Sequence, residues 1–115
     1  MLVDTSVWVD HLRKRNARLA ELLNSAQVVI HPLIIGELSC GNIANRSEVL
    51  SLLSSLPRVA VLEHDEVMDF VAANKLHGRG LGWIDMHILA SMRLASIPLL
   101  TLDKRLATAA SALAA

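Results

Sequence analysis

Apolar positions along the chain follow two kinds of spacing. Short apolar runs, several of them bounded by proline or a polar residue, predict buried strands at 1–3, 27–30, 59–62 and 99–102. Between these runs, apolar residues recur every three or four positions. That spacing predicts helices over 5–13, 17–23, 32–43, 46–56, 64–77 and 84–95, and a last helix that begins at Asp103. The alternation predicts an α/β domain with a parallel sheet and helices on its faces.

Composition adds limits to this picture. The 115 residues are 53% hydrophobic, which fits one folded domain spanning 1–115 with a sizeable core. The Ala/Ser-rich tail from about 107 is expected to be a frayed helix or a short disordered end. Lys and Arg together number 11, as do Asp and Glu, so a neutral total argues against a protein that coats polyanions non-specifically.

Targeting and membrane signals are absent from the pattern. No apolar run approaches the roughly 18 residues of a membrane helix, and we see no signal-peptide pattern, so we expect a cytoplasmic protein with no membrane partner. The high apolar content indicates that part of the apolar surface is covered by a partner protein or buried in a dimer interface.

Four acidic residues lie where the predicted strands and helices meet. Asp4 and Asp103 each follow an apolar strand and precede a helix. Asp85 begins a helix after a glycine-rich loop, and Glu37 lies in the helix that follows the second strand. Because parallel sheets place ligands at the carboxyl ends of their strands, we expect these carboxylates to converge there. Clustered carboxylates repel one another, and a hard divalent ion such as Mg²⁺ or Mn²⁺ removes that cost. Such a site is suited to phosphodiester hydrolysis by a metal-activated water.

Simpler interpretations of each acid remain open. Asp4, Asp85 and Asp103 could be helix-capping or dipole-stabilising residues. Glu37 stands among apolar neighbours and is therefore expected to be partly buried. Its simpler interpretation is a structural salt bridge to an arginine.

Four blocks of the chain together resemble a known family. They are Leu-Val-Asp-Thr-Ser-Val-Trp at 2–8, Ile-Ile-Gly-Glu-Leu at 34–38, Trp-Ile-Asp-Met-His-Ile-Leu-Ala at 83–90 and Leu-Leu-Thr-Leu-Asp-Lys-Arg at 99–105. In order and spacing they resemble the PIN-domain ribonucleases, in particular the toxins of bacterial VapBC-type toxin–antitoxin pairs. The resemblance covers essentially the whole chain, although the chain is short for the family.

The resemblance implies a three-layer α/β/α domain with a central parallel sheet of four to five strands. It also implies that Asp4, Glu37, Asp85 and Asp103 bind Mg²⁺ or Mn²⁺ and act in the cleavage of RNA by an endoribonuclease. Ser6 and Thr101 match small hydroxyl positions that support such a site, with capping or core hydroxyls as the alternative. Family members form homodimers and are neutralised by a small antitoxin protein.

Basic and aromatic residues offer further candidates. Lys104 and Arg105 follow Asp103 directly, and Arg13 and Lys14 belong to a basic cluster just after the first helix, so all four are candidates for contact with RNA phosphates. A solvated helix face is the alternative for the second pair. Trp8 and Trp83 could stack on bases, but their apolar surroundings favour core or interface packing.

Two other function classes compete with a ribonuclease. One is a catalytically inactive PIN-like module that binds a protein through its apolar surface, and the full acidic quartet argues against it. The other is a phosphatase or phospho-acceptor that uses Asp4 as nucleophile. The chain lacks the second Asp two positions after Asp4 and the lysine motif that this chemistry needs.

Overall fold

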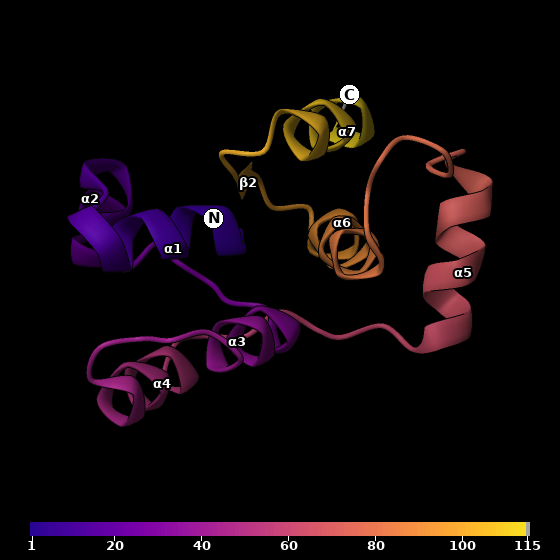
Figure 1. Cartoon of the computed structure of the whole chain (residues 1–115). Helices are drawn as coiled ribbons and strands as arrows, with labels where there is room; N and C mark the ends of the chain where they lie inside the picture. The colour runs from indigo at the N-terminus through magenta and orange to yellow at the C-terminus, as the bar shows by residue number, and fades with distance from the viewer. Residues whose placement is uncertain (115) are drawn as a thin grey trace.

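The computed structural model describes residues 1–114 and consists mainly of helices around a small parallel sheet (Figure 1). All seven predicted helices are present, and their bounds agree with the prediction within two residues except for two helices that end four residues early. The elements in chain order are β1 (Leu2–Val3), α1 (Thr5–Lys14), α2 (Ala17–Asn24), α3 (Pro32–Ser39), α4 (Arg46–Ser54), α5 (His64–Ala73), α6 (Trp83–Ala95), β2 (Leu99–Leu100) and α7 (Lys104–Ala114).

The sheet is smaller than the sequence predicts. Strands β1 and β2 pair in parallel, with Leu2 opposite Leu99 and Val3 opposite Leu100. Single parallel bridges add the other two predicted strands, one between Leu2 and Val29 and one between Ile30 and Arg58. Four parallel segments therefore lie side by side, but only two form regular strands. The prediction of four to five strands is not confirmed, and the three-layer arrangement stays a prediction.

Two helices end earlier than their apolar periodicity indicates. The helix predicted over 32–43 stops at Ser39, where the N–H groups of Cys40 and Gly41 turn back onto the carbonyls of Glu37 and Leu38. The helix predicted over 64–77 stops at Ala73, and Lys75 takes a left-handed φ of 51° that ends the helical path. In both cases local backbone geometry overrides the apolar pattern.

The C-terminal segment is helical as far as Ala114, so within the described residues it is not an irregular end, and fraying of this helix stays a prediction. Four of its apolar residues are buried, at the spacing of one helical face: Leu106, Ala109, Ala110 and Leu113. The small Ala and Ser side chains, which led to the expectation of a frayed or disordered end, allow this face to pack against α6. Within residues 1–114, no helix is both long enough and apolar enough to cross a membrane.

Helix α6 lies in the middle of the molecule and contacts both α5 and α7 (Figure 1). Every residue from Met86 to Met92 is buried. Ser91 Oγ donates to the carbonyl of Ala60 at 2.7 Å, which ties α6 to the chain that leads from Arg58 to α5. Asp85 lies in the first turn of this buried helix, so the packing of α6 determines where its carboxylate lies.

Candidate active site

Asp4 is the most buried of the four predicted acids. It follows β1 directly, caps the N-terminus of α1 and is 6% exposed. Its Oδ2 accepts hydrogen bonds from Ser6 Oγ at 2.8 Å and from Thr101 Oγ1 at 2.8 Å. In the part of the chain that the structure describes, Oδ1 accepts no hydrogen bond, so one carboxylate oxygen remains free for a ligand. Asp4 is thus both a cap and a candidate ligand.

The register of the sheet explains why Thr101 reaches Asp4. Val3 and Leu100 are partners in parallel strands, so the next residues, Asp4 and Thr101, emerge together from the carboxyl edge. Ser6 Oγ also accepts from the N–H of Leu102 at 3.0 Å. Ser6 and Thr101, predicted as supporting residues, therefore hold the Asp4 carboxylate and join the ends of the two strands.

Asp85 is half-buried at the third position of α6. Its Oδ2 accepts from the backbone N–H of Gly82 at 2.9 Å, which caps the helix. Burial raises the pKa of Asp85, and the negative charges of Asp4 and Asp103 raise it further, against the lowering effect of the Gly82 hydrogen bond. Asp4 and Asp103 therefore both lie within electrostatic range of Asp85.

Asp103 is exposed and caps α7. Its Oδ1 accepts from the N–H of Arg105 at 2.9 Å and from that of Leu106 at 3.2 Å. Its own N–H donates to Thr101 Oγ1 at 3.0 Å, which connects it to the hydroxyls around Asp4. Asp103 therefore serves as a helix cap beside the site, and a role as metal ligand stays a prediction.

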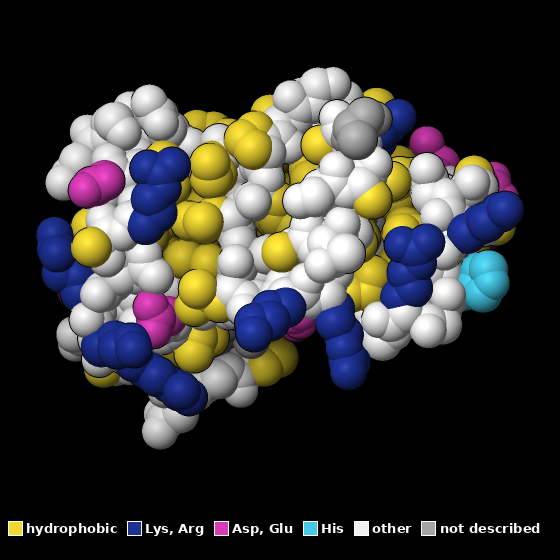
Figure 2. Space-filling model, turned by 90° about the horizontal axis from the view of Figure 1, so that it is seen from above, with side chains coloured by type: hydrophobic (Ala, Val, Ile, Leu, Met, Phe, Trp, Pro, Cys, Tyr) yellow, Lys and Arg dark blue, Asp and Glu magenta, His cyan; other side chains and the backbone are white. Residues whose placement is uncertain are grey.

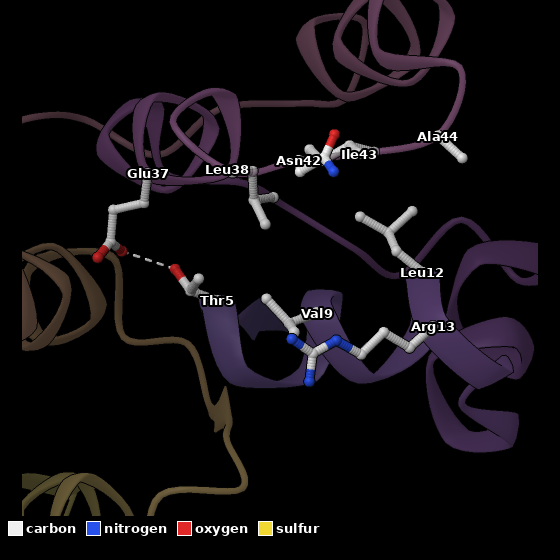
Figure 3. A pocket seen from close by; sticks show the side chains of 10 residues that line it. Thr5, Val9, Leu12, Arg13, Glu37, Leu38, Asn42, Ile43 and Ala44 are labelled. Carbon is white, nitrogen blue, oxygen red and sulfur yellow. Dashed lines mark hydrogen bonds between the residues drawn. The ribbon is translucent and has the colours of Figure 1, made fainter.

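Glu37 is exposed, so the prediction that it is partly buried was wrong. Its apolar neighbours Ile34 and Leu38 turn inward on α3 while Glu37 turns outward. Glu37 Oε1 accepts from Thr5 Oγ1 at 2.7 Å, and Glu37 belongs to neither ion pair found within residues 1–114 (Figure 3). Since Thr5 follows Asp4 directly, this contact brings Glu37 close to the other acids without a salt bridge.

Asp4 and Asp103 lie close enough to Asp85 to affect its pKa, and Glu37 contacts Thr5 beside Asp4, but these residues do not form a preformed metal site. Within residues 1–114, no three Asp, Glu, His or Cys side chains stand in a geometry that could already hold a metal ion. Asp4, Asp85 and Asp103 are linked by charge, and Glu37 is linked to Asp4 through Thr5. A cation that bound here would therefore need side-chain movements, and Glu37 and Asp103 are the exposed members of the set.

A hollow leads away from Glu37 along α1. It is lined by Thr5 and Glu37 at one end, by Val9 and Leu38 between, and by Arg13 farther along (Figure 3). Arg13 also lines a second hollow with Lys14, Ser6 and Leu102. Lys14 forms an ion pair with Asp10 at 3.5 Å, so its charge is partly neutralised. Of these two basic candidates, Arg13 is the one whose charge is available beside the acids.

The face of the molecule seen from above carries Lys and Arg side chains spread among apolar ones (Figure 2). Lys104 and Arg105 are exposed in the first turn of α7, next to Asp103. Their placement beside the acidic edge fits the prediction of RNA contact, which stays a prediction.

Two histidines near this edge were missed by the sequence analysis. His31 follows Ile30, caps α3 by accepting the N–H of Leu33 at 3.0 Å, and is fully buried. Its ring meets that of His87 edge-on, with 6.2 Å between ring centres. Burial, with a smaller effect of His87, lowers the pKa of His31 to about 4. The sequence signal was the Pro32 that starts α3, because a cap must precede it.

The two tryptophans differ in their surroundings. Trp8 is 3% exposed, so the prediction of core packing is confirmed for it. Trp83 is 40% exposed and its ring lies 4.9 Å from that of His64 and 5.0 Å from that of His87. Trp83 is therefore not a core residue, and base stacking and interface packing both remain open for it.

Comparison with known proteins identifies the family. The model of the PIN domain matches residues 1–112. The chain belongs to the PIN-domain family, and its similarity to the relatives below places it among the VapC-type members of that family.

Two curated relatives and one solved structure extend this assignment. Ribonuclease VapC32 from two strains of Mycobacterium tuberculosis (CDC 1551 / Oshkosh and ATCC 25618 / H37Rv) is 48% identical over 110 residues, which is 95% of this chain and 89% of that protein. The crystal structure of PAE2754 from Pyrobaculum aerophilum superposes with a TM-score of 0.67 at 22% identity, covering 94% of this chain and 82% of that one. At that identity, the second likeness shows the fold alone.

Proposed function

We propose that this protein is a divalent-metal-dependent endoribonuclease and the toxin of a toxin–antitoxin pair. The relatives at 48% identity are named as VapC ribonucleases, which supports RNA as the substrate. The observation that carries the proposal is the uncompensated negative charge at the edge of the sheet. Asp85 is half-buried, the charges of Asp4 and Asp103 add to the burial that raises its pKa, and it forms no ion pair within residues 1–114.

The donor set fits a hard divalent ion. The candidate ligands are all carboxylate oxygens, which Mg²⁺ and Mn²⁺ prefer to nitrogen or sulfur. Asp4 and Asp85 each use only Oδ2 in a hydrogen bond to the protein within residues 1–114, so each keeps Oδ1 available. Asp4, Asp85 and Asp103 would hold the ion, and Glu37 would join through its flexible side chain. When bound, the ion supplies an activated water and stabilises charge on the phosphate oxygens.

The protein's own residues would orient this chemistry. Ser6 and Thr101 fix the Asp4 carboxylate by two hydrogen bonds to one oxygen, so its free oxygen keeps a constant position. The N–H of Gly82 does the same for Asp85. Glu37, held by Thr5, is the exposed acid best placed to accept a proton from an attacking water. Arg13, in the adjoining hollow, would contact the RNA backbone.

Cleavage assays test this function. Purified protein should cut total bacterial RNA with Mg²⁺ or Mn²⁺ and lose that activity in EDTA. Asp85→Asn should reduce cleavage by about 100-fold or more, because a neutral amide is a poor ligand for a hard cation. The amide oxygen still accepts from Gly82, so the fold should survive. The control is Asp69→Asn on the exposed side of α5. Undiminished cleavage by Asp85→Asn would contradict the proposal.

Two protein partners belong to the same proposal. An apolar groove between α1, α2 and α4 includes Leu12 and Leu52, which are 39% and 62% exposed. A groove of this kind supports binding of an amphipathic segment from an antitoxin. The homodimer also stays a prediction, which sedimentation of the purified chain would test. If the protein bound such a partner but neither RNA nor Mg²⁺, the inactive PIN-like module would be the better assignment.

A further inference from the structure

Arg105 lies across the glycine-containing loop that precedes α6. A β-carbon at Gly80 would be 2.5 Å from Arg105 Nη1, 3.2 Å from Cζ and 3.3 Å from Cδ. The arginine side chain therefore rests on the backbone of Gly80 from its aliphatic part to its guanidinium group. Real β-carbons do not approach other atoms this closely, so any other residue at position 80 must displace Arg105.

This contact joins the two segments that carry Asp103 and Asp85. The N–H of Arg105 donates to Asp103 Oδ1 at 2.9 Å, so the arginine begins at the Asp103 side of the site. Its side chain ends at Gly80, two residues before Gly82, whose N–H donates to Asp85 Oδ2. The guanidinium is thereby placed at the rim of the acidic edge.

Arg105 forms no ion pair in the described part of the chain. The ion pairs within residues 1–114 are Lys14 with Asp10 and Arg18 with Glu21. The only hydrogen bond that Arg105 donates within those residues comes from its backbone N–H, so the guanidinium donors are left for another partner. A guanidinium that is held in position but unpaired matches the two oxygens of a phosphate group.

We propose that Arg105, seated on Gly80, binds a backbone phosphate of the RNA beside the acidic site. This inference rests on the proposed ribonuclease function and adds the residue that holds the substrate there. The glycine serves two purposes: its φ of +76° suits a residue without a side chain, and its bare backbone leaves room for the arginine. Because the side chain is already placed, little ordering is needed when RNA binds.

Binding of a fluorescein-labelled, single-stranded 15-nucleotide RNA of mixed sequence tests the role of Arg105. All variants carry Asp85→Asn to prevent cleavage, and anisotropy gives Kd across a series of KCl concentrations in Mg²⁺. Arg105→Ala should weaken binding about tenfold at low salt and reduce the slope of log Kd against log salt by about 0.7, the value for one lost phosphate contact on a single strand. Arg105→Lys should have a Kd and a salt slope between those of the parent and those of Arg105→Ala. Arg46→Ala removes an arginine on α4, far from α7 in Figure 1, and should change neither quantity.

A pair of glycine variants tests whether the contact with Gly80 positions Arg105. Gly78 and Gly80 have similar left-handed φ values, +72° and +76°, so alanine strains the loop equally at either position. Only at Gly80 would the new methyl group meet Arg105, since a β-carbon at Gly78 has no atom within 4 Å. Gly80→Ala should therefore reproduce the loss seen for Arg105→Ala, and Gly78→Ala should bind like the parent. In the Arg105→Ala background, Gly80→Ala should cause no further loss.

The outcomes separate this inference from the proposed function. If the chain without Asp85→Asn cuts RNA but Arg105→Ala leaves the salt slope unchanged, the inference is wrong and the ribonuclease assignment stands. Equal losses of RNA affinity for Gly78→Ala and Gly80→Ala would refute a positioning role of Gly80, because strain in the loop alone would explain them. If the chain without Asp85→Asn neither cuts nor binds RNA, the proposed function fails together with this inference. Circular dichroism and thermal unfolding of each variant confirm that losses do not come from unfolding.

Discussion

Thr101 Oγ1 donates a hydrogen bond to Asp4 Oδ2 at 2.8 Å across 97 positions of sequence. The two residues follow the paired ends of parallel strands β1 and β2, so the register of the sheet creates the contact. Asp4 is 6% exposed, and a carboxylate so far from water needs such donors. The hydroxyl thus links the stability of the fold to the position of a candidate metal ligand.

Thr101→Val should lower both stability and activity. Valine keeps the shape of threonine but cannot donate to Asp4, which would leave a buried carboxylate short of one hydrogen bond. We expect a loss of about 1 to 3 kcal/mol in the free energy of unfolding, measured in urea. RNA cleavage should fall as well, because Asp4 is then held by Ser6 alone.

Thr108→Val is the matched control for that change. Thr108 lies on the exposed side of α7, and its hydroxyl donates to the carbonyl of Lys104 at 2.9 Å within the same helix. We expect a change within about 0.5 kcal/mol, as for other surface substitutions. Similar losses for both variants would show that the Asp4 contact contributes little.

Stability should decrease in mild acid because of His31. Burial lowers its pKa from the ordinary 6.5 to about 4. Between these pH values the unfolded chain binds a proton that the folded chain does not, so acid favours unfolding. The contribution is complete above about pH 6.5 and is lost as the pH falls toward 4. His87, which faces His31 from α6, adds in the same direction, since burial also lowers its pKa.

Urea unfolding at pH 7, 6 and 5 measures this effect. His31→Asn keeps a side-chain acceptor for the N–H of Leu33, because asparagine is a good helix cap. It removes the titrating group, so its stability should fall less steeply with decreasing pH than that of the parent. Parallel curves would show that His31 does not control the acid response.

Gly36→Ala should stabilise the protein. Gly36 is an exposed residue inside α3, and a β-carbon there has no atom within 4 Å. Alanine favours the helix by about 0.5 to 1 kcal/mol relative to glycine. Gly78→Ala should do the opposite by about 1 kcal/mol, because Gly78 has a left-handed φ of +72°. Thermal unfolding of the two variants, compared with the parent, checks both signs.

The positions of the helices were predictable because apolar residues on the buried face of a helix recur every three or four positions. Helix ends were not, since the stops at Ser39 and Ala73 depend on local turns of the backbone. The frayed or disordered tail was predicted from composition, yet this segment is a helix that buries Leu106 and Leu113 and contacts α6. Small residues are compatible with either outcome, and the partner surface decides between them.

The candidate site was predictable where it depended on strand ends. Asp4 and Asp103 could be placed at one edge because residues after parallel strands share an edge, but β2 ends at Leu100, so the residue that lies beside Asp4 is Thr101. The exposure of Glu37 could not be predicted, because Ile34 and Leu38 define the buried face of α3 only after the helix has docked. The seat of Arg105 on Gly80 depends on how α7 meets the loop before α6, which no local pattern encodes.

Binding of Mn²⁺ tests the central claim that the acidic edge is a cation site. Titration of the metal-free protein, followed by electron paramagnetic resonance of free Mn²⁺, gives affinity without any RNA. We predict saturable binding that Asp85→Asn weakens at least about tenfold, because it removes one charged ligand beside Asp4 and Asp103. Asp69→Asn, on α5, should bind Mn²⁺ like the parent. Equal affinity of the parent and Asp85→Asn, or no binding by the parent at all, would contradict the account.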